Sequence, residues 1–244
     1  MELVEAAHRR LIDSLHGLTD EQVRQPSLLP DWTVGHTLSH IALNAEALVN
    51  VTSGIRQGLI GLMYPSIQSR NDAIEAGAKR SASEITMHLE RAGEALESIW
   101  ATLTPRELAR EAATVSGMPT FPASSIPMLR LREIEVHGSD TGLPGLSIAK
   151  WSDAYVDADL PIQLAKVPER LGHWFAAIDE DGMVHVAEPQ HFDRTQGGSV
   201  VIDQRHATTL VSTRREILAW CLNRSQPEGF PPLGPWQTPP SSTP

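Results

Sequence analysis

The chain has 244 residues, of which 41% are hydrophobic, and its formal net charge is -10. This length suffices for one large domain or two modest ones, and the apolar share is enough to build a core. Because phosphate binding needs a clustered basic face, the acidic balance and the lack of a basic stripe argue against a nucleic-acid partner.

The start of the sequence lacks the features of a secreted or membrane protein. It has neither the positive segment nor the apolar core of a secretory signal, and no apolar run approaches the ~18 residues of a membrane span. We therefore expect a soluble, cytoplasmic protein with no membrane contact. The single cysteine, Cys221, excludes an intrachain disulfide, and its apolar neighbours favour a buried, inert thiol.

The first fifty residues predict two helices. Apolar side chains recur at helical intervals over residues 3–17, and Gly17 marks the end of that helix. After a turn-rich stretch, Asp31 or Thr33 can cap a second helix over residues 34–49. One face of this second helix presents three polar residues: His36, His40 and Asn44.

Two further helices are predicted before residue 150. Residues 51–80, which glycines and a proline interrupt, are expected to form a loop with a short helix. Residues 81–103 begin with a serine–glutamate capping-box pair and continue as an amphipathic helix. A link with two prolines then leads to a helix that Ser125 can cap and that ends at Gly138.

The expected fold class is a two-domain α plus α/β protein. Residues 1–150 predict an up-and-down four-helix bundle, in which inward-facing side chains of different helices can make a metal site. Residues 151–225 predict a small α+β C-terminal domain, and residues 226–244 a Pro-rich tail, since the last 20 residues contain seven prolines. Within the second domain we expect strands at 183–187, 199–203 and 207–211, a turn at 179–182, and a capped helix from Thr213 to near Arg224.

Three side chains of the predicted bundle suggest a zinc site with one open position: His40, Glu133 and His137. Zinc accepts imidazole nitrogen and carboxylate oxygen, and catalytic zinc keeps about three protein ligands. Glu133 and His137 are four apart, so on a helix they project from one face, about 5 to 6 Å apart at Cβ. By spacing alone, a solvated surface pair is the commoner explanation. The histidines without a partner pattern, such as His8, are expected at the surface or a boundary.

Two segments resemble the metal-binding helices of the mycothiol-dependent maleylpyruvate isomerase family, whose first domain is a DinB-like four-helix bundle. They are residues 29–45, LPDWTVGHTLSHIALNA, and residues 132–143, REIEVHGSDTGL. In that family the second histidine of the first segment and the glutamate and histidine of the second hold zinc. The resemblance therefore implies His40, Glu133 and His137 as the metal ligands here.

A third segment, residues 217–224 (ILAWCLNR), resembles the C-terminal helix of the same family, which ends in an arginine needed for activity. The resemblance implies that Arg224 is catalytic. Asn223 stands where family members usually have glycine, which puts the local helix-end geometry in question but not the charge. From the residues alone, the commoner explanation of Arg224 is a cation at a helix C-terminus with no catalytic role. A weaker similarity around residues 63–71 includes Arg70.

The sequence allows more than one role for several polar residues near the predicted ligands. His36 is four residues before His40 and could bind the metal, but the family favours His40 alone, with His36 packed against a neighbouring helix. Asn44 is either a hydrogen-bonding partner of the site or an ordinary polar residue of its helix. Asp140 could orient His137 or cap the following turn. The candidates for binding substrate or thiol are Arg70, Asn44 and Asp140.

The resemblance implies a zinc- and mycothiol-dependent enzyme that isomerises maleylpyruvate to fumarylpyruvate in gentisate-type aromatic breakdown. A free thiol, with a pKa of about 8.5, is mostly protonated at neutral pH, and coordination to zinc deprotonates it. We expect the thiolate to add reversibly to the substrate's double bond, while Arg224 holds a carboxylate.

Two alternatives remain open from the sequence. One is a mycothiol S-transferase that acts on another electrophilic metabolite or xenobiotic, since it needs the same activated thiolate. The other is a non-catalytic, metal-stabilised binding module. In the two enzymatic cases the partners are a small-molecule substrate and a low-molecular-weight thiol, and the protein is expected to be a monomer or small homo-oligomer.

Overall fold

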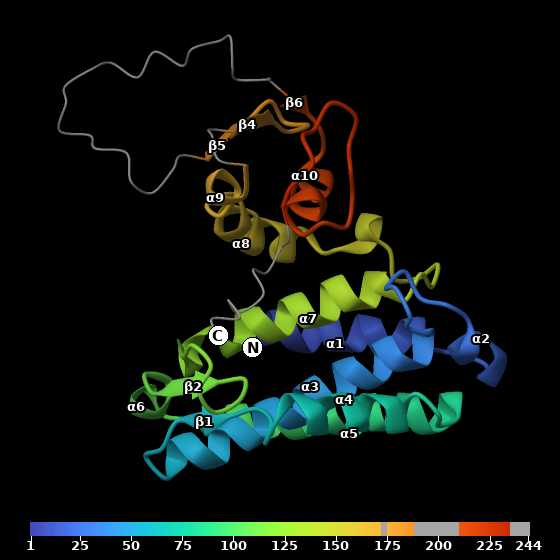
Figure 1. The fold of residues 1–244 in the computed structure, drawn as a ribbon, viewed down its shortest axis with the longest axis vertical. Coiled ribbons are helices and arrows are strands. Elements are labelled where there is room, and N and C mark those ends of the chain that lie inside the picture. Colours follow the sequence, from blue (N-terminus) through green and yellow to red (C-terminus); the bar gives the residue numbers. More distant parts are fainter. Residues whose placement is uncertain (172–174, 188–209, 235–244) are drawn as a thin grey trace, which may run out of the picture. The chain divides into compact units, whose positions relative to one another are not determined.

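The computed structural model describes residues 1–171, 175–187 and 210–234 (Figure 1). The chain divides into two compact units, Met1–Lys150 and Trp151–Pro244. Helices dominate both units in the described residues, and each unit also has a small sheet. None of the described helices combines the length and the apolar character that crossing a bilayer requires.

Four long helices form the first unit's core within the described residues, and Figure 1 shows them side by side. They are α1 (Glu2–Ser14), α3 (Val34–Arg56), α5 (Ala82–Trp100) and α7 (Ile126–Asp140). α3 packs against both α5 and α7, and α1 packs against α7 and α5. Their apolar stripes meet in a buried core, and removing that apolar surface from water is the main stabilising contribution. The four-helix bundle predicted from the sequence is confirmed.

Shorter elements complete the first unit. They are α2 (Asp20–Arg24), α4 (Ile67–Gly77), α6 (Pro105–Leu108), β1 (Gly61–Leu62), β2 (Glu111–Ala113), β3 (Phe121–Pro122) and the 3-10 turns Ala123–Ser125 and Ile148–Lys150. β2 pairs in parallel with β1 and antiparallel with β3. The sequence did not predict this sheet, because strands of two or three residues are too short to show an alternating pattern.

The second unit combines helices with a sheet whose described strands run in the order β5-β4-β6. Its elements are α8 (Asp153–Leu164), α9 (Val167–Leu171), β4 (Phe175–Ile178), β5 (Val184–Ala187), β6 (Leu210–Val211) and α10 (Arg214–Cys221). Phe175 stacks on Trp220 with ring centroids 4.5 Å apart, which joins β4 to α10. The predicted strand at 199–203 lies outside the described residues.

The only cysteine of the sequence ends α10. Cys221 is buried in the second unit, and burial raises the pKa of its thiol to about 12. The expectation of a buried, inert thiol is confirmed, since a thiol with so high a pKa stays protonated at neutral pH.

α3 is longer than the sequence indicated. It continues to Arg56 through Gly54, which looked like a helix breaker. A Cβ on Gly54 would lie 2.9 Å from the Cα of Gly61, so the glycine lets β1 pass close to the helix. A glycine needed for such a close approach cannot be distinguished from a breaker by sequence alone.

α7 differs from the prediction at both ends. Ser125 does not cap its first turn, and its Oγ donates instead to the carbonyl oxygen of Pro122 at 2.6 Å. The helix also continues past Gly138 to Asp140. Asp140 therefore lies one turn after His137 on the same helix.

His8 is buried, where the sequence suggested a surface or boundary position. It is 6% exposed, and its Nε2 lies 3.1 Å from the carbonyl oxygen of Leu89 on α5. A Cβ on Gly93 would lie 1.8 Å from Cε1 of the His8 ring, so the ring occupies the space that this glycine leaves open. The prediction was wrong because a glycine notch on a neighbouring helix has no signature in the periodicity around His8.

Candidate metal centre

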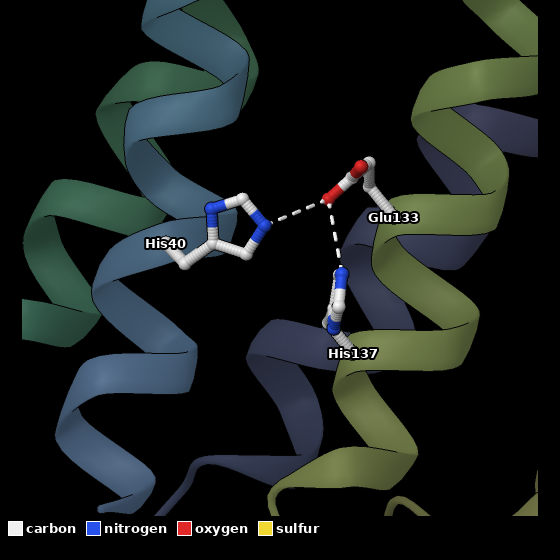
Figure 2. Close-up of side chains that lie close together, drawn as sticks. All are labelled: His40, Glu133 and His137. Carbon is white, nitrogen blue, oxygen red and sulfur yellow. Dashed lines mark ion pairs between the residues drawn. The ribbon is translucent and has the colours of Figure 1, made fainter. Parts of the chain in front are cut away.

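Three side chains from two adjacent helices converge in the first unit (Figure 2). α3 supplies His40, and α7 supplies Glu133 and His137 one turn apart. Their potential ligand atoms all lie within 4.8 Å of one another. Oε2 of Glu133 is 3.2 Å from Nε2 of His40 and 3.5 Å from Nε2 of His137. The residues suggested by the sequence are thus brought together.

The start of α3 explains why His40 and His36 have different surroundings. Thr33 caps the helix, and the ring Nδ1 of His36 accepts a hydrogen bond from the backbone N–H of Thr33 at 3.2 Å. Nε2 of His36 lies 3.4 Å from a carboxylate oxygen of Glu75 on α4. His36 is therefore engaged by the helix cap and by α4, and it is not a member of the three-residue group.

Asp140 fixes the orientation of His137. Its Oδ2 lies 2.8 Å from Nδ1 of the ring, and a carboxylate can only accept there, so Nδ1 has the hydrogen. The lone pair of Nε2 then faces Oε2 of Glu133. In the neutral ring, two lone pairs then face each other and call for a cation between them, either a proton or a metal ion, and this pattern is typical of metal-binding histidines.

Glu133 is suited to remain ionised. Burial alone would raise the pKa of its carboxyl, but His137, His40 and the Arg130 guanidinium outweigh burial and lower the pKa to about 2. Its Oε2 is buried and faces the Nε2 atoms of His40 and His137. A buried, ionised oxygen beside two imidazole nitrogens is a suitable ligand for a divalent cation.

His40 is suited to remain neutral. Burial is the largest influence on its ring and lowers its pKa, although the nearby Glu133 acts in the opposite direction. A neutral imidazole offers a nitrogen lone pair, which a metal ligand must have. Trp32 covers the ring edge-on, with centroids 5.6 Å apart. The donor set of two imidazoles and one carboxylate fits zinc or a similar divalent ion.

Arg130, which sequence reasoning missed, ties the two ligand-bearing helices together. It is 1% exposed, and its Nη1 donates to the carbonyl oxygen of Ile41 at 2.7 Å and to Oδ1 of Asn44 at 3.0 Å. Asn44 therefore contacts Arg130, an interaction the sequence did not indicate. The available signal was spacing, since Arg130 is three residues before Glu133 and shares its helix face.

Arg70 lies directly behind His40. Its Nη2 is 3.3 Å from Nδ1 of His40, and its Nη1 donates to Oδ1 of Asn71 at 3.1 Å. Its guanidinium carbon lies 5.9 Å from the centroid of the Tyr64 ring. The hydroxyl of Tyr64 is buried, and burial raises its pKa to about 12.

Arg224 belongs to the second unit, whereas the group on α3 and α7 belongs to the first. Its Nη1 donates to the carbonyl oxygen of Leu222 at 3.0 Å. Asn223 adopts a positive φ of 56°, a conformation that glycine favours and asparagine tolerates. Arg224 lines a cavity of about 360 Å³ together with Trp220, Asn223, Ser225, Gln226, Pro232 and Leu233.

Comparisons with known proteins agree with the fold. Residues 4–142 match the family model described as the mycothiol maleylpyruvate isomerase N-terminal domain. A crystal structure of a mycothiol-dependent maleylpyruvate isomerase aligns with a TM-score of 0.73 at 21% identity, covering 92% of this chain and 88% of that one. A histidine-to-alanine variant structure aligns with a TM-score of 0.72 at 20% identity over the same shares. No curated protein matches the sequence.

Proposed function

We propose a function for this chain on the premise that it belongs to the mycothiol maleylpyruvate isomerase family, whose N-terminal domain it matches over residues 4–142. The proposal is that the protein is an enzyme that isomerises maleylpyruvate to fumarylpyruvate with a divalent metal, zinc, and mycothiol. The observation that supports it most directly is the group of His40, Glu133 and His137, whose ligand atoms lie within 4.8 Å of one another.

The residues of the first unit would hold the metal in a defined way. His40 and His137 offer imidazole nitrogens, and Glu133 offers a carboxylate oxygen, which leaves one position for another ligand. Asp140 keeps the ring hydrogen of His137 on Nδ1, so that Nε2 can bind the metal. Arg130 on α7 donates a hydrogen bond to Ile41 on α3 and so links the two helices that hold the three ligands. A bound metal and mycothiol would together supply a thiolate that adds reversibly to the double bond, so that rotation can follow.

The remaining work is to hold the anionic substrate. Arg70 is close to the metal ligands and can pair with a carboxylate in bidentate fashion. We assign the same task to Arg224, which would also stabilise the negative charge that arises during addition. The contrary interpretation is that Arg224 only completes the end of α10, where its Nη1 donates to Leu222.

The decisive assay follows thiol-dependent isomerisation of maleylpyruvate by zinc-loaded protein, with metal content measured on the same sample. We expect turnover that requires both zinc and mycothiol, and its loss in His40→Ala. Arg224→Ala should lower turnover while thermal stability and zinc content stay the same. Unchanged turnover in that variant would remove Arg224 from the mechanism.

The same assay separates the alternative of a mycothiol S-transferase. The metal ligands serve either reaction, because both need only an activated thiolate. Net consumption of thiol would indicate transfer, whereas constant thiol with a changed double bond indicates isomerisation. Zinc binding without any effect of thiol would indicate a metal-stabilised binding module.

A further inference from the structure

We propose that metal binding at His40 displaces Arg70 and thereby makes its guanidinium available to a carboxylate ligand, so that metal and carboxylate bind cooperatively. This inference rests on the proposed metal centre and extends it. It concerns a coupling between two binding events rather than the identity of the metal ligands.

The contact between Arg70 and His40 determines where the ring hydrogen lies. A guanidinium can only donate hydrogen bonds, and it does not lose its proton in proteins. Nη2 of Arg70 lies 3.3 Å from Nδ1 of His40, so Nδ1 must be the acceptor. In a neutral ring the hydrogen is then on Nε2, the nitrogen that faces Glu133 at 3.2 Å.

A metal at the three-residue group requires the opposite arrangement. The nitrogen of His40 that faces Glu133 is Nε2, and it can bind a cation only with its lone pair. The ring hydrogen then has to be on Nδ1, where it would point at the N–H of Arg70. Two donors cannot share a hydrogen bond, so the Arg70–His40 contact and metal binding exclude each other.

His137 shows the contrast within the same site. Its Nδ1 donates to Asp140, so its Nε2 lone pair is already directed at Glu133. One imidazole is therefore prepared for a metal, and the other is held in the incompatible form by a cation. For both imidazoles to bind the same metal ion, Arg70 has to move away from Nδ1 of His40.

The surroundings of Arg70 favour an anion as its next partner. The ring of Tyr64 has its centroid 5.9 Å from the guanidinium carbon, and its hydroxyl is buried. Arg70 beside His40 and Arg130 beside Glu133 bring two positive charges to the site, and the carboxylates of Glu133 and Asp140 offset them. A divalent cation would add two further positive charges, and a bound carboxylate would offset part of them through charge-assisted hydrogen bonds.

The coupling has a thermodynamic signature. If a carboxylate binds better after Arg70 is released, the same carboxylate must raise the metal affinity by the same factor. The test is zinc titration of the full-length protein against a competing chelator, with and without succinate at constant ionic strength. Succinate is a suitable probe because it is a dicarboxylate without a reactive double bond.

For the wild-type protein we expect succinate to raise the zinc affinity about fivefold or more. Arg70→Met should bind zinc about tenfold more tightly without succinate, because one competing hydrogen bond and one repelling charge are gone. Succinate should then have no effect. Arg70→Gln, whose amide oxygen can accept from Nδ1–H, should also bind zinc more tightly than wild type.

The chain contains a matched control. Nη1 of Arg80 lies 3.2 Å from Nδ1 of His88, whose Nε2 lies 2.8 Å from a carboxylate oxygen of Glu46. This repeats the arginine–histidine–glutamate arrangement outside the metal group. Arg80→Met should therefore leave both the zinc affinity and the succinate effect at wild-type values.

The inference is overturned if Arg70→Met and Arg80→Met bind zinc equally and both keep the succinate effect. Nitrogen-15 spectra of the histidine rings give an independent check, with the His40 hydrogen on Nε2 before zinc is added and on Nδ1 afterwards. A hydrogen on Nδ1 from the start would also overturn it. Absence of zinc binding in the wild-type protein would instead refute the metal centre on which the inference rests.

Discussion

Oδ2 of Asp140 lies 2.8 Å from Nδ1 of His137, and this contact decides which nitrogen of the ring faces Glu133. We predict that Asp140→Ala weakens zinc binding about 10- to 100-fold, because the ring loses both its orientation and the partner that makes it a better ligand. Asp140→Asn, which keeps an acceptor oxygen, should lose less. Competition with a chelator measures both variants.

A control for this prediction is Asp179→Asn in the second unit. Oδ2 of Asp179 lies 2.8 Å from Nε2 of His185, in a similar carboxylate–histidine pair that belongs to no ligand group among the described residues. Its replacement should leave zinc affinity unchanged. Equal affinities of the Asp140→Ala and wild-type proteins, with both folded, would show that His137 needs no orienting partner.

The pKa of Glu133 predicts an acid-dependent contribution to folding. Its pKa falls from 4.5 to about 2 in the folded protein, so the folded state favours the ionised carboxylate. The stabilising contribution is therefore present above pH 4.5 and is lost as the pH falls towards 2. Chelator-treated protein isolates this effect from metal binding.

The measurement compares wild type with Glu133→Gln, which has no titrating group at this position. The free energy of unfolding of the wild type, measured relative to that of Glu133→Gln, should decrease as the pH falls from 4.5 towards 2. A difference that does not change with pH would mean that Glu133 has the same pKa in both states.

Arg130 should matter for stability as well as for the position of the ligands. Arg130→Met leaves the carbonyl oxygen of Ile41 and Oδ1 of Asn44 without this donor in the core, and we expect a loss of about 2–3 kcal/mol. Arg130→Lys keeps a donor and should lose less. Urea denaturation of both variants tests this, and equal midpoints for wild type and Arg130→Met would contradict it.

Gly93 should tolerate no side chain while His8 is in place. Gly93→Ala would put a methyl group 1.8 Å from the His8 ring, and we expect a loss of about 1–3 kcal/mol. The double variant with His8→Ala should recover part of this loss, since the smaller side chain makes room. Gly138→Ala is the helical control, where the nearest atom would be 3.8 Å away.

Additive effects of the His8 and Gly93 substitutions would contradict that prediction. Thermal or urea unfolding of the two single variants and the double variant gives the coupling free energy directly. The glycine control should change stability by less than about 1 kcal/mol.

The sequence predicted the long helices of the bundle well, because each has an apolar stripe and two of them, α3 and α5, also have a capping signal. Ser81 and Glu84 form the predicted capping box at the start of α5, and Thr33 caps α3. It did not predict features that depend on contacts between distant segments. The passage of β1 over Gly54 and the burial of His8 against Gly93 are of this kind.

The candidate metal site could likewise be predicted only in part from the sequence. Spacing put Glu133 and His137 on one face of a helix, and the family resemblance added His40 from a helix ninety residues earlier. Nothing in the sequence pattern indicated that Arg130 would cross to Asn44 or that Arg70 would meet Nδ1 of His40. These contacts depend on how α3, α4 and α7 pack, and periodicity within one helix does not determine that packing.

The burial of Cys221 has a consequence for how this protein depends on small thiols in the cell. A protein whose own sulfur stays protonated and covered cannot replace an external thiol when that thiol runs out. The rate of the proposed reaction would then depend on how much of the cell's small thiol is in the reduced form. Oxidants and alkylating agents would stop the reaction by consuming a diffusible reagent, and the folded chain would be ready to resume once that pool is restored.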